Sequence, residues 1–338
     1  MLTIAFDGAC FGDGPTTGVG RAFATGLAAY AARGDADCVL LLPANASDPA
    51  IPGVRTVKAP RGALRRQLQL PHLLRTLRAD LLHSSVAAVP LRAPCPTIAT
   101  VHDLPWLHDE LRAPDVGERT SRWRIFATVR ALRSAAAVLA PSQFTARDAR
   151  IAMQRRDARL VVVPHGTTLG PAPTDAAIDA RSEPFLVLGD DRPRKNRARL
   201  VAAWQRALSV RPSLPPLRFV GPPDGYVDEA KKLRLLASCR ALVHVSRFEG
   251  FGLPVLEGLA HGAPVLCSDL PPHREIAGEH AEFVLPTDVD AIAAGLVRLD
   301  RDRDRRRALA HGGHARARSF APAAVANAWH RLHTELCR

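Results

Sequence analysis

The 338-residue sequence has few of the features that mark metal-binding, disulfide-bonded or membrane-spanning proteins. Its six cysteines are scattered and form no C-x-x-C pair, which argues against a zinc site or a disulfide framework and favours the reducing cytoplasm. No stretch approaches about 18 apolar residues, so we expect no membrane-spanning helix. The start, MLTIAFDGAC, lacks the regions of a signal peptide and predicts a strand.

Acidic and aromatic residues are also scarce. Lys and Arg number 46 against 33 Asp and Glu, a net charge of +13 that favours phosphates, nucleic acid or a lipid surface as partners. An arginine-rich composition of the whole genome would explain this excess equally well. Aromatic residues make up 5% of the chain, and no helix-turn-helix or RNP-like motif is present, which argues against a nucleic-acid-binding protein.

Short apolar runs alternate with helical patterns, beginning with LTIAF, CVLLL, LLHSS, TIATV, AAVLA and LVVVP. This rhythm predicts an α/β fold with a doubly wound parallel sheet. It stops in a stretch rich in Pro, Ala, Thr and Asp, and restarts with FLVLG, LRFVG, ALVHVS, APVLCS and AEFVL. We therefore expect two Rossmann-like domains, residues 1–170 and 184–319, joined by a linker at 171–183. Ligands of such sheets bind beyond the carboxyl ends of strands, so we expect the site in a cleft between the domains.

Two segments of the first domain follow strands and are candidates for the site. Gly18 and Gly20 precede a helix expected to begin near Arg21, where backbone amides would approach an anion. An ordinary flexible loop is an equal alternative, and GVGR lacks the G-x-G-x-x-G pattern of dinucleotide-binding proteins. His102 follows the strand TIATV and would hydrogen-bond a sugar hydroxyl or a phosphate, unless its role is structural or helix-capping.

In the second domain, the loop DDRPRKNRARL follows the first strand. Arg194 and Lys195 stand just before a helix expected from Asn196. Lysine as a point charge and arginine as a planar fork both suit a diphosphate at a helix start. A solvated basic loop is the alternative interpretation.

The segment SRFEGFGLPVLEG is the most informative part of the sequence. Glu249 lies in a loop after the strand ALVHVS, and Pro254 predicts a helix over 254–261 that carries Glu257. Carboxylates only accept hydrogen bonds, and sugars offer hydroxyl donors. The helix start supplies backbone amides for an anion. We interpret the segment as a holder for a phosphate with a sugar on each side.

These residues resemble a known family. E-G-F-G-L-P-x-x-E, with glutamates at i and i+8, resembles the signature of the retaining GT-B glycosyltransferases of family 4. GVGR, HDLPWLH, APSQFTARD, VVPHGTTLG and PRKN resemble further motifs of this family, so the resemblance covers most of the chain. The sequence looks most similar to bacterial mannosyl- and rhamnosyltransferases of surface-polysaccharide synthesis.

The resemblance implies a catalytic role for four side chains. Lys195 and Arg194 would neutralise the diphosphate of the donor. Glu249 would hold the donor sugar, and His102 would contact this sugar near the reacting carbon. The resemblance also implies a group of donor-binding residues, with Glu257 on the ribose and the others providing backbone amides: Gly18, Gly20, Gly250, Phe251, Gly252, Leu253 and Glu257.

The implied reaction moves a hexose from a nucleotide-diphosphate sugar, GDP-mannose above all, to a glycan or a polyprenyl-linked glycan. The anomeric configuration would be retained through front-face attack assisted by the leaving phosphate, with no metal and no cofactor. The acidic strings DVD and DRDRD are accordingly expected at the surface. The C-terminal helix, residues 320–338, would cross back to the first domain.

Three departures from the family pattern leave an alternative open. Asp190 stands where relatives often carry Arg, and His165 replaces the usual Asn. Within residues 217–246, one βα unit of the usual pattern is missing, in a region that often borders the nucleobase. A catalytically silent relative that binds a sugar nucleotide is therefore the alternative to an active enzyme.

Residues 61–78, RGALRRQLQLPHLLRTLR, contain five arginines and no acid. Their leucines form an apolar side, as in helices that lie on anionic lipid. A core-facing helix with a solvated basic back is the alternative. The first interpretation predicts a cytoplasmic protein in peripheral contact with the inner face of an anionic membrane.

Overall fold

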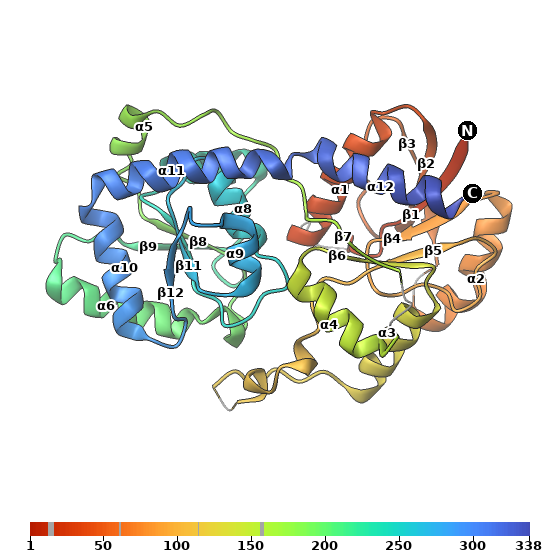
Figure 1. The fold of residues 1–338 in the computed structure, drawn as a ribbon, viewed down its shortest axis with the longest axis horizontal. Helices are drawn as coiled ribbons and strands as arrows, with labels where there is room; N and C mark the ends of the chain where they lie inside the picture. Colours follow the sequence, from red (N-terminus) through yellow and green to blue (C-terminus); the bar gives the residue numbers. More distant parts are fainter. Residues whose placement is uncertain (13–16, 61, 114, 156–158) are drawn as a thin grey trace. The chain divides into compact units, whose positions relative to one another are not determined.

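The computed structural model describes residues 1–12, 17–60, 62–113, 115–155 and 159–338. These residues form two compact units (Figure 1). Unit 1 comprises Met1–Leu107, Thr120–Gly166 and Phe320–Arg338, and unit 2 comprises His108–Arg119 and Thr167–Ser319. The short segment His108–Arg119, which the strand pattern placed within the first domain, thus belongs to the second unit.

Unit 1 contains a parallel sheet of seven strands in the order β3-β2-β1-β4-β5-β6-β7. The six apolar runs predicted to be strands are confirmed, whereas β3 was missed. The sequence of β3, VRTVKA, lies at the sheet edge and is only partly buried, so it has no continuous apolar run. The strands are β1 (Leu2–Asp7), β2 (Ala36–Pro43), β3 (Val54–Ala59), β4 (Leu81–Ser84), β5 (Thr97–Thr100), β6 (Ala137–Ala140) and β7 (Leu160–Val162).

Helices cover both faces of this sheet, as a doubly wound fold requires. α1 (Gly18–Ala31) and α12 (Pro322–Leu336) pack on one face, where Phe6, Phe23 and Trp329 belong to one buried cluster. α2 (Ala63–Thr76), α3 (Arg122–Ser134) and α4 (Gln143–Met153) pack on the other face (Figure 1).

Trp329 of α12 lies close to the backbone of α1. A Cβ atom added to Gly26 would stand 2.8 Å from the Trp329 ring, so only glycine fits at this position. The ring is 6% exposed and lies 4.5 Å from the His83 ring and 5.7 Å from the Phe23 ring, measured between centroids. The C-terminal helix is therefore part of the core of unit 1.

We predict that Trp329→Ala destabilises the protein by about 3–5 kcal/mol, because it removes a buried aromatic ring and leaves a cavity. Denaturant unfolding measures this loss. Arg331→Ala, at an exposed position of the same helix, is the matched control and should leave the unfolding free energy nearly unchanged. Equal stability of both variants would show that α12 is not part of the core.

Unit 2 contains a parallel sheet of five strands in the order β12-β11-β10-β8-β9. All five predicted runs form strands: β8 (Phe185–Leu188), β9 (Leu217–Val220), β10 (Leu242–His244), β11 (Val265–Ser268) and β12 (Glu282–Val284). The helices are α5 (Asp175–Asp179), α6 (Arg197–Val210), α7 (Glu229–Ser238), α8 (Leu253–Ala260), α9 (Pro271–Ala277), α10 (Val289–Arg301) and α11 (Arg303–Ala317).

The sheet of unit 2 ends at β9, which is an edge strand. A short bridge between Gly221 and Gly225 follows it, then α7, and then β10. The chain between β9 and β10 thus forms one helix and no further strand, which agrees with the missing βα unit in residues 217–246.

Residues 171–183, expected as a linker, are largely built into unit 2. They contain α5, and Ile178 is completely buried. Arg181 is 5% exposed and donates four hydrogen bonds of 2.7–3.2 Å to carbonyl oxygens at the ends of α7 and α8. These carbonyls have no partner within their helices, so the arginine satisfies both ends. The segment lacks a periodic apolar pattern because the side chain that mainly fixes it to unit 2, that of Arg181, is charged.

In the described residues, short 3₁₀ turns are also present: η1 (Pro105–Leu107), η2 (Asp109–Arg112), η3 (Pro193–Lys195) and η4 (Arg318–Phe320). Of the helices in the described ranges, none has the length and apolar character needed to cross a membrane.

Candidate functional site

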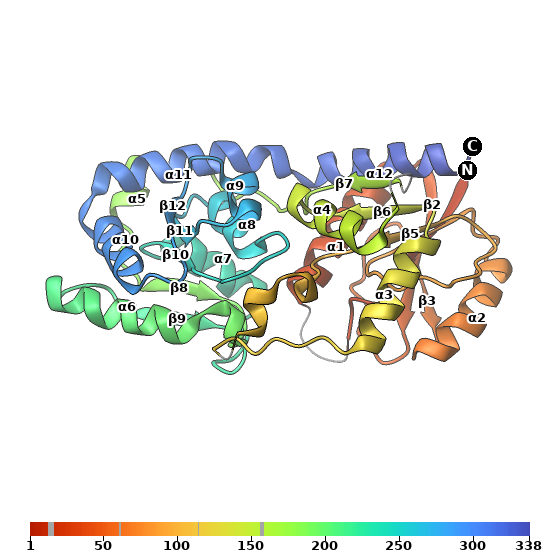
Figure 2. The ribbon, with the colours of Figure 1, turned by 60° about the horizontal axis from the view of Figure 1, so that its bottom comes forward.

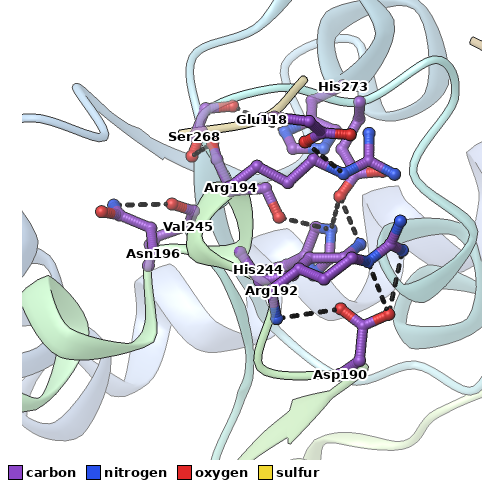
Figure 3. A network of polar contacts seen from close by, with 12 residues as sticks. Glu118, Asp190, Arg192, Arg194, Asn196, His244, Val245, Ser268 and His273 are labelled. Atoms are coloured by element: carbon purple, nitrogen blue, oxygen red, sulfur yellow. Dashed lines mark hydrogen bonds and ion pairs between the residues drawn. The ribbon is translucent and has the colours of Figure 1, made fainter. Parts of the chain in front are cut away.

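The three central strands of unit 2 each end at a polar segment. β8 leads to η3 with Arg194 and Lys195, β10 leads to the loop with Ser246 and Glu249, and β11 ends at Ser268. These strands are neighbours in a parallel sheet, so their carboxyl ends meet at one edge. Asn196 ties two of the segments together, because its side-chain amide donates to the Val245 carbonyl at 2.9 Å (Figure 3).

Glu249 is the centre of this polar network. One of its oxygens, Oε1, accepts a hydrogen bond from Lys195 Nζ at 2.7 Å and another from His244 Nε2 at 3.0 Å. Burial alone would raise the pKa of this carboxyl, but the charge of Lys195 and the His244 hydrogen bond hold it well below its usual range. Glu249 is therefore an ionised acceptor, 9% exposed, in a fixed orientation.

His244 contacts this carboxylate directly, and the His273 ring lies 5.5 Å from the His244 ring, measured between centroids. His273 Nδ1 lies 2.8 Å from the Ser268 carbonyl, and the Ser268 hydroxyl donates to the Ser246 carbonyl at 2.5 Å (Figure 3). Since a carbonyl only accepts, His273 carries its proton on Nδ1. Burial lowers the pKa of His244 and lowers the pKa of His273 to about 4, so both rings are neutral at pH 7.

The loop that leads into α8 lies directly against His273. Gly252 has φ +110°, and a Cβ atom there would stand 2.7 Å from His273 Cδ2. Both facts require glycine at this position. The helix begins at Leu253, one residue earlier than predicted, and carries Pro254 in its first turn. Of the predicted donor-binding backbone, Gly250, Phe251 and Gly252 form the bend that leads into α8, and Leu253 is the first residue of the helix.

Arg194, whose charge also helps to lower the pKa of the Glu249 carboxyl, forms an ion pair with Glu118. Its side chain is 6% exposed, and its Nε lies 3.4 Å from Glu118 Oε2 (Figure 3). The guanidinium lies 5.8 Å from the centre of the Phe248 ring. Glu118 therefore balances the charge that was expected to face a diphosphate. No local pattern could indicate this partner, because Glu118 lies 76 positions earlier in the chain.

Glu257 has a lysine partner of its own. Lys232 Nζ of α7 lies 2.7 Å from Glu257 Oε1 and 2.8 Å from a Glu229 oxygen, and its side chain is 8% exposed. Glu257, the acid predicted to bind the ribose, is thus paired with a lysine of α7, which lies in the segment where one βα unit is missing. Lys232 was not among the predicted site residues.

Asp190, the departure from the family pattern at the end of β8, is paired within its own loop. Arg192 donates to it from Nε at 2.9 Å and from the backbone amide at 3.3 Å (Figure 3). Burial opposes its ionisation, but the hydrogen bonds and charge of Arg192 lower the pKa of the Asp190 carboxyl.

In unit 1, His102 lies two residues beyond β5 and is held by the neighbouring strand's loop. Its Nε2 donates to the Ser85 carbonyl at 2.8 Å, which leaves Nδ1 as an acceptor without a hydrogen-bond partner among the described residues. The His165 ring stacks on it at 5.3 Å between centroids. Burial lowers the pKa of His102, and lowers the pKa of His165 to about 3, so both are neutral.

Gly18 and Gly20 lie inside the first turn of α1 rather than in a loop before it. Thr17 caps this helix, and its hydroxyl oxygen accepts from the Gly20 amide at 3.2 Å. The expectation that the helix begins near Arg21 is therefore wrong by three residues, and the Gly20 amide is already engaged in the cap.

The acidic strings of the second domain have structural roles. The side chains of Asp288 and Asp302 cap the N-termini of α10 and α11 by accepting hydrogen bonds from backbone amides. Asp300 is 8% exposed and accepts from Arg211 at 2.9 Å, so it is not the surface residue we expected. Within the described ranges, no group of three or more His, Cys, Asp or Glu side chains is arranged to hold a metal ion.

Because the pKa of His273 is lowered in the folded state, it contributes stability that is present above pH 6.5 and is lost as the pH falls. We predict that the wild type loses about 2 kcal/mol more unfolding free energy than His273→Gln between pH 7 and pH 5. Denaturant unfolding at both pH values measures this difference.

The exposed His72→Gln provides the control and should lose as much stability on acidification as the wild type. Identical acid sensitivity of His273→Gln and the wild type would mean that His273 is not buried neutral in the folded protein.

Two family models match the chain. The model described as "Glycosyltransferase Family 4" matches residues 18–170, and the model described as "Glycosyl transferases group 1" matches residues 224–316. The second match contains Glu249, Glu257 and Lys232, whereas Lys195 lies between the two matched regions.

Two similar proteins are mannosyltransferases by name. The "O-antigen chain mannosyltransferase B" of Escherichia coli is 38% identical over 96 residues, which are 28% of this chain and 25% of that protein. The "MMP alpha-(1->4)-mannosyltransferase" of Mycolicibacterium hassiacum is 40% identical over 98 residues, 28% of this chain and 23% of that protein. The aligned region thus spans a quarter or less of these relatives.

Solved structures resemble the whole chain. Sucrose-phosphate synthase of Thermosynechococcus elongatus has a TM-score of 0.79 at 16% identity, with 99% of both chains covered. Anabaena HepE, solved in complex with UDP and glucose, has a TM-score of 0.69 at 18% identity, with 99% of this chain and 100% of that chain covered. At this level of identity the likeness concerns the fold, which is the two-domain GT-B fold.

Proposed function

Because this chain belongs to the family-4-like glycosyltransferases with the GT-B fold, we propose that it transfers a hexose from a nucleotide-diphosphate sugar to a glycan or a lipid-linked glycan. The observation that carries this proposal is the ion pair of Lys195 and Glu249. It places a cation and an ionised acceptor side by side at the carboxyl edge of the unit 2 sheet, beside the start of α8.

The proposed donor is GDP-mannose, and the proposed process is the synthesis of a surface polysaccharide. Two relatives of 38% and 40% identity are mannosyltransferases by name, one of them for an O-antigen chain. These alignments cover only 28% of this chain, so they support the sugar more than the acceptor. HepE, with UDP and glucose bound, supports a nucleotide-diphosphate sugar as the class of donor.

We assign the charge of Lys195 to the leaving diphosphate. In the reaction, the bond between the anomeric carbon and the β-phosphate oxygen breaks, and the acceptor hydroxyl oxygen bonds to the same face of the sugar. The acceptor proton passes to the leaving phosphate oxygen. Negative charge develops on that phosphate in the transition state, where a fixed cation and backbone amides are most effective.

Glu249 and Glu257 are assigned to hydroxyl groups of the donor sugar and of the ribose. An ionised carboxylate only accepts, and each glutamate is oriented by its own lysine, Lys195 for Glu249 and the buried Lys232 for Glu257. His102 fits a similar role, because its free acceptor is the Nδ1 lone pair of a neutral ring. Nδ1 is buried in the structure, so it would accept a hydrogen bond from a sugar hydroxyl only after the side chains around it move.

A silent relative remains the second candidate, on the strength of the five-stranded sheet of unit 2. Because β9 is the edge strand, the βα unit that the resemblance places beside the nucleobase is missing. The chain around Gly225 and α7 would have to contact the nucleobase instead. Such a relative would bind a sugar nucleotide without turnover, so binding and transfer have to be measured separately.

We predict that GDP-mannose raises the melting temperature more than UDP- or dTDP-linked sugars. A ligand at about 100 times its dissociation constant adds about 2.7 kcal/mol of stability. Lys232→Met should remove most of this shift, because Glu257 loses the cation that orients it. The neighbouring exposed Lys231→Met is the matched control and should keep the full shift. Stabilisation by none of the three donors would contradict the proposal.

For transfer, we predict that Lys195→Met and Glu249→Gln each lower kcat by about 10²–10³-fold, as loss of one fixed transition-state partner does in other enzymes. The exposed Glu279→Gln and Lys231→Met are controls and should retain full activity. EDTA should have no effect on the wild type, and the product anomer should match that of the donor. Binding of the donor without transfer by the wild type would favour the silent relative.

A further inference from the structure

The positive charge of the unit 1 helices is concentrated on one face. α2, α3 and α4 together hold nine arginines and a single acid, Asp148, which is 2% exposed. α1 and α12, on the opposite face, hold two arginines and one glutamate. A bias in composition would raise the arginine content of both faces, so it does not explain this difference.

The same face exposes large apolar side chains. Trp123 and Phe126 of α3 are 70% and 56% exposed, with ring centroids 5.8 Å apart. Leu64 and Leu68 of α2 are 72% and 69% exposed. Side chains of this size are buried wherever a partner within the fold exists, and several of them on one face mark an interaction surface.

The arginines beside these side chains are available for a partner. Arg65, Arg122 and Arg124 are exposed, and none of them forms an ion pair within the described part of the chain. Arg66 differs, because its guanidinium is paired with the buried Asp7 carboxylate at the end of β1. Of residues 61–78, therefore, only part of the basic charge faces outward, and Arg61 lies outside the described residues.

The leucines of α2 divide in the same way. Leu70 and Leu74 are completely buried in the core between α2 and the sheet, whereas Leu64 and Leu68 are exposed. The leucines therefore do not form a single apolar side that faces lipid, and the alternative of a core-facing helix is confirmed for Leu70 and Leu74. The helix packs on the core through its second half and exposes apolar side chains only in its first two turns.

The exposed side chains lie toward one edge of the sheet. α2 ends just before β4 and α3 ends just before β6, so the first turns of both helices point to the carboxyl edge of the unit 1 strands (Figure 2). His102 follows β5 at this same edge. A surface that covers these turns would therefore lie near the edge that carries the candidate site residue of unit 1.

We propose that this docking face, formed by the first turns of α2 and α3, binds the surface of an anionic lipid bilayer. Trp123, Phe126, Leu64 and Leu68 enter the headgroup region, and the three exposed arginines contact lipid phosphates. The amphipathic ring of tryptophan favours this interface, phenylalanine and leucine bury apolar surface in it, and each nearby arginine adds attraction to an anionic surface. The inference deepens the lipid-linked acceptor of the proposed function, but the binding itself needs neither donor nor acceptor.

Vesicle flotation of the full chain tests the docking face. The vesicles contain either phosphatidylcholine alone or phosphatidylcholine with phosphatidylglycerol. We expect binding to the anionic vesicles only, with affinity that falls as salt rises. Trp123→Ala/Phe126→Ala and Arg122→Glu/Arg124→Glu should each weaken binding about tenfold or more. Arg318→Glu/Arg331→Glu, at exposed positions outside this face, is the charge-matched control and should bind like the wild type.

Three outcomes would overturn the proposal: absence of binding to the anionic vesicles, equal binding by the docking-face variants and the control, or loss of binding to duplex DNA rather than to vesicles in these variants. Glu249→Gln separates this proposal from the proposed function. It should bind vesicles like the wild type even though its transfer activity is lost, so failure of either proposal leaves the other measurable.

Discussion

The ion pair of Lys195 and Glu249 joins the loops after two neighbouring strands, β8 and β10, and the polar edge of unit 2 depends on it. Both side chains are largely buried, and removal of one partner from such a pair costs about 3–5 kcal/mol because the other charge is left uncompensated. His244 adds a neutral hydrogen-bond donor to the same oxygen. The result is a carboxylate that stays ionised although it is 9% exposed.

Both units contain a pair of buried, neutral histidines. In unit 2, His244 and His273 lie under the loop that carries Glu249, and in unit 1, His102 and His165 stack beyond β5. Burial keeps all four rings neutral, so they add donors and acceptors without adding charge. The positive charges are instead provided by lysines at the site and by arginines on the face of unit 1 that carries α2, α3 and α4.

Local patterns predicted what depends on local sequence. The apolar runs located every strand except β3, whose partly exposed edge position gives no such run. The glutamates at i and i+8 located the loop and helix of unit 2. Partners from distant segments could not be predicted, because no spacing links Glu118 to Arg194 or Lys232 to Glu257. The division of α2 into a core half and an exposed half likewise depends on packing against the sheet.

A crystal structure of the chain with GDP-mannose and no acceptor is the most direct test of the account. We expect Lys195 Nζ to contact a diphosphate oxygen, Glu249 to accept from a hydroxyl of the mannose, and Glu257 to accept from the ribose. A nucleotide bound elsewhere, or a diphosphate beyond hydrogen-bond reach of Lys195 with the Lys195–Glu249 pair unchanged, would contradict it.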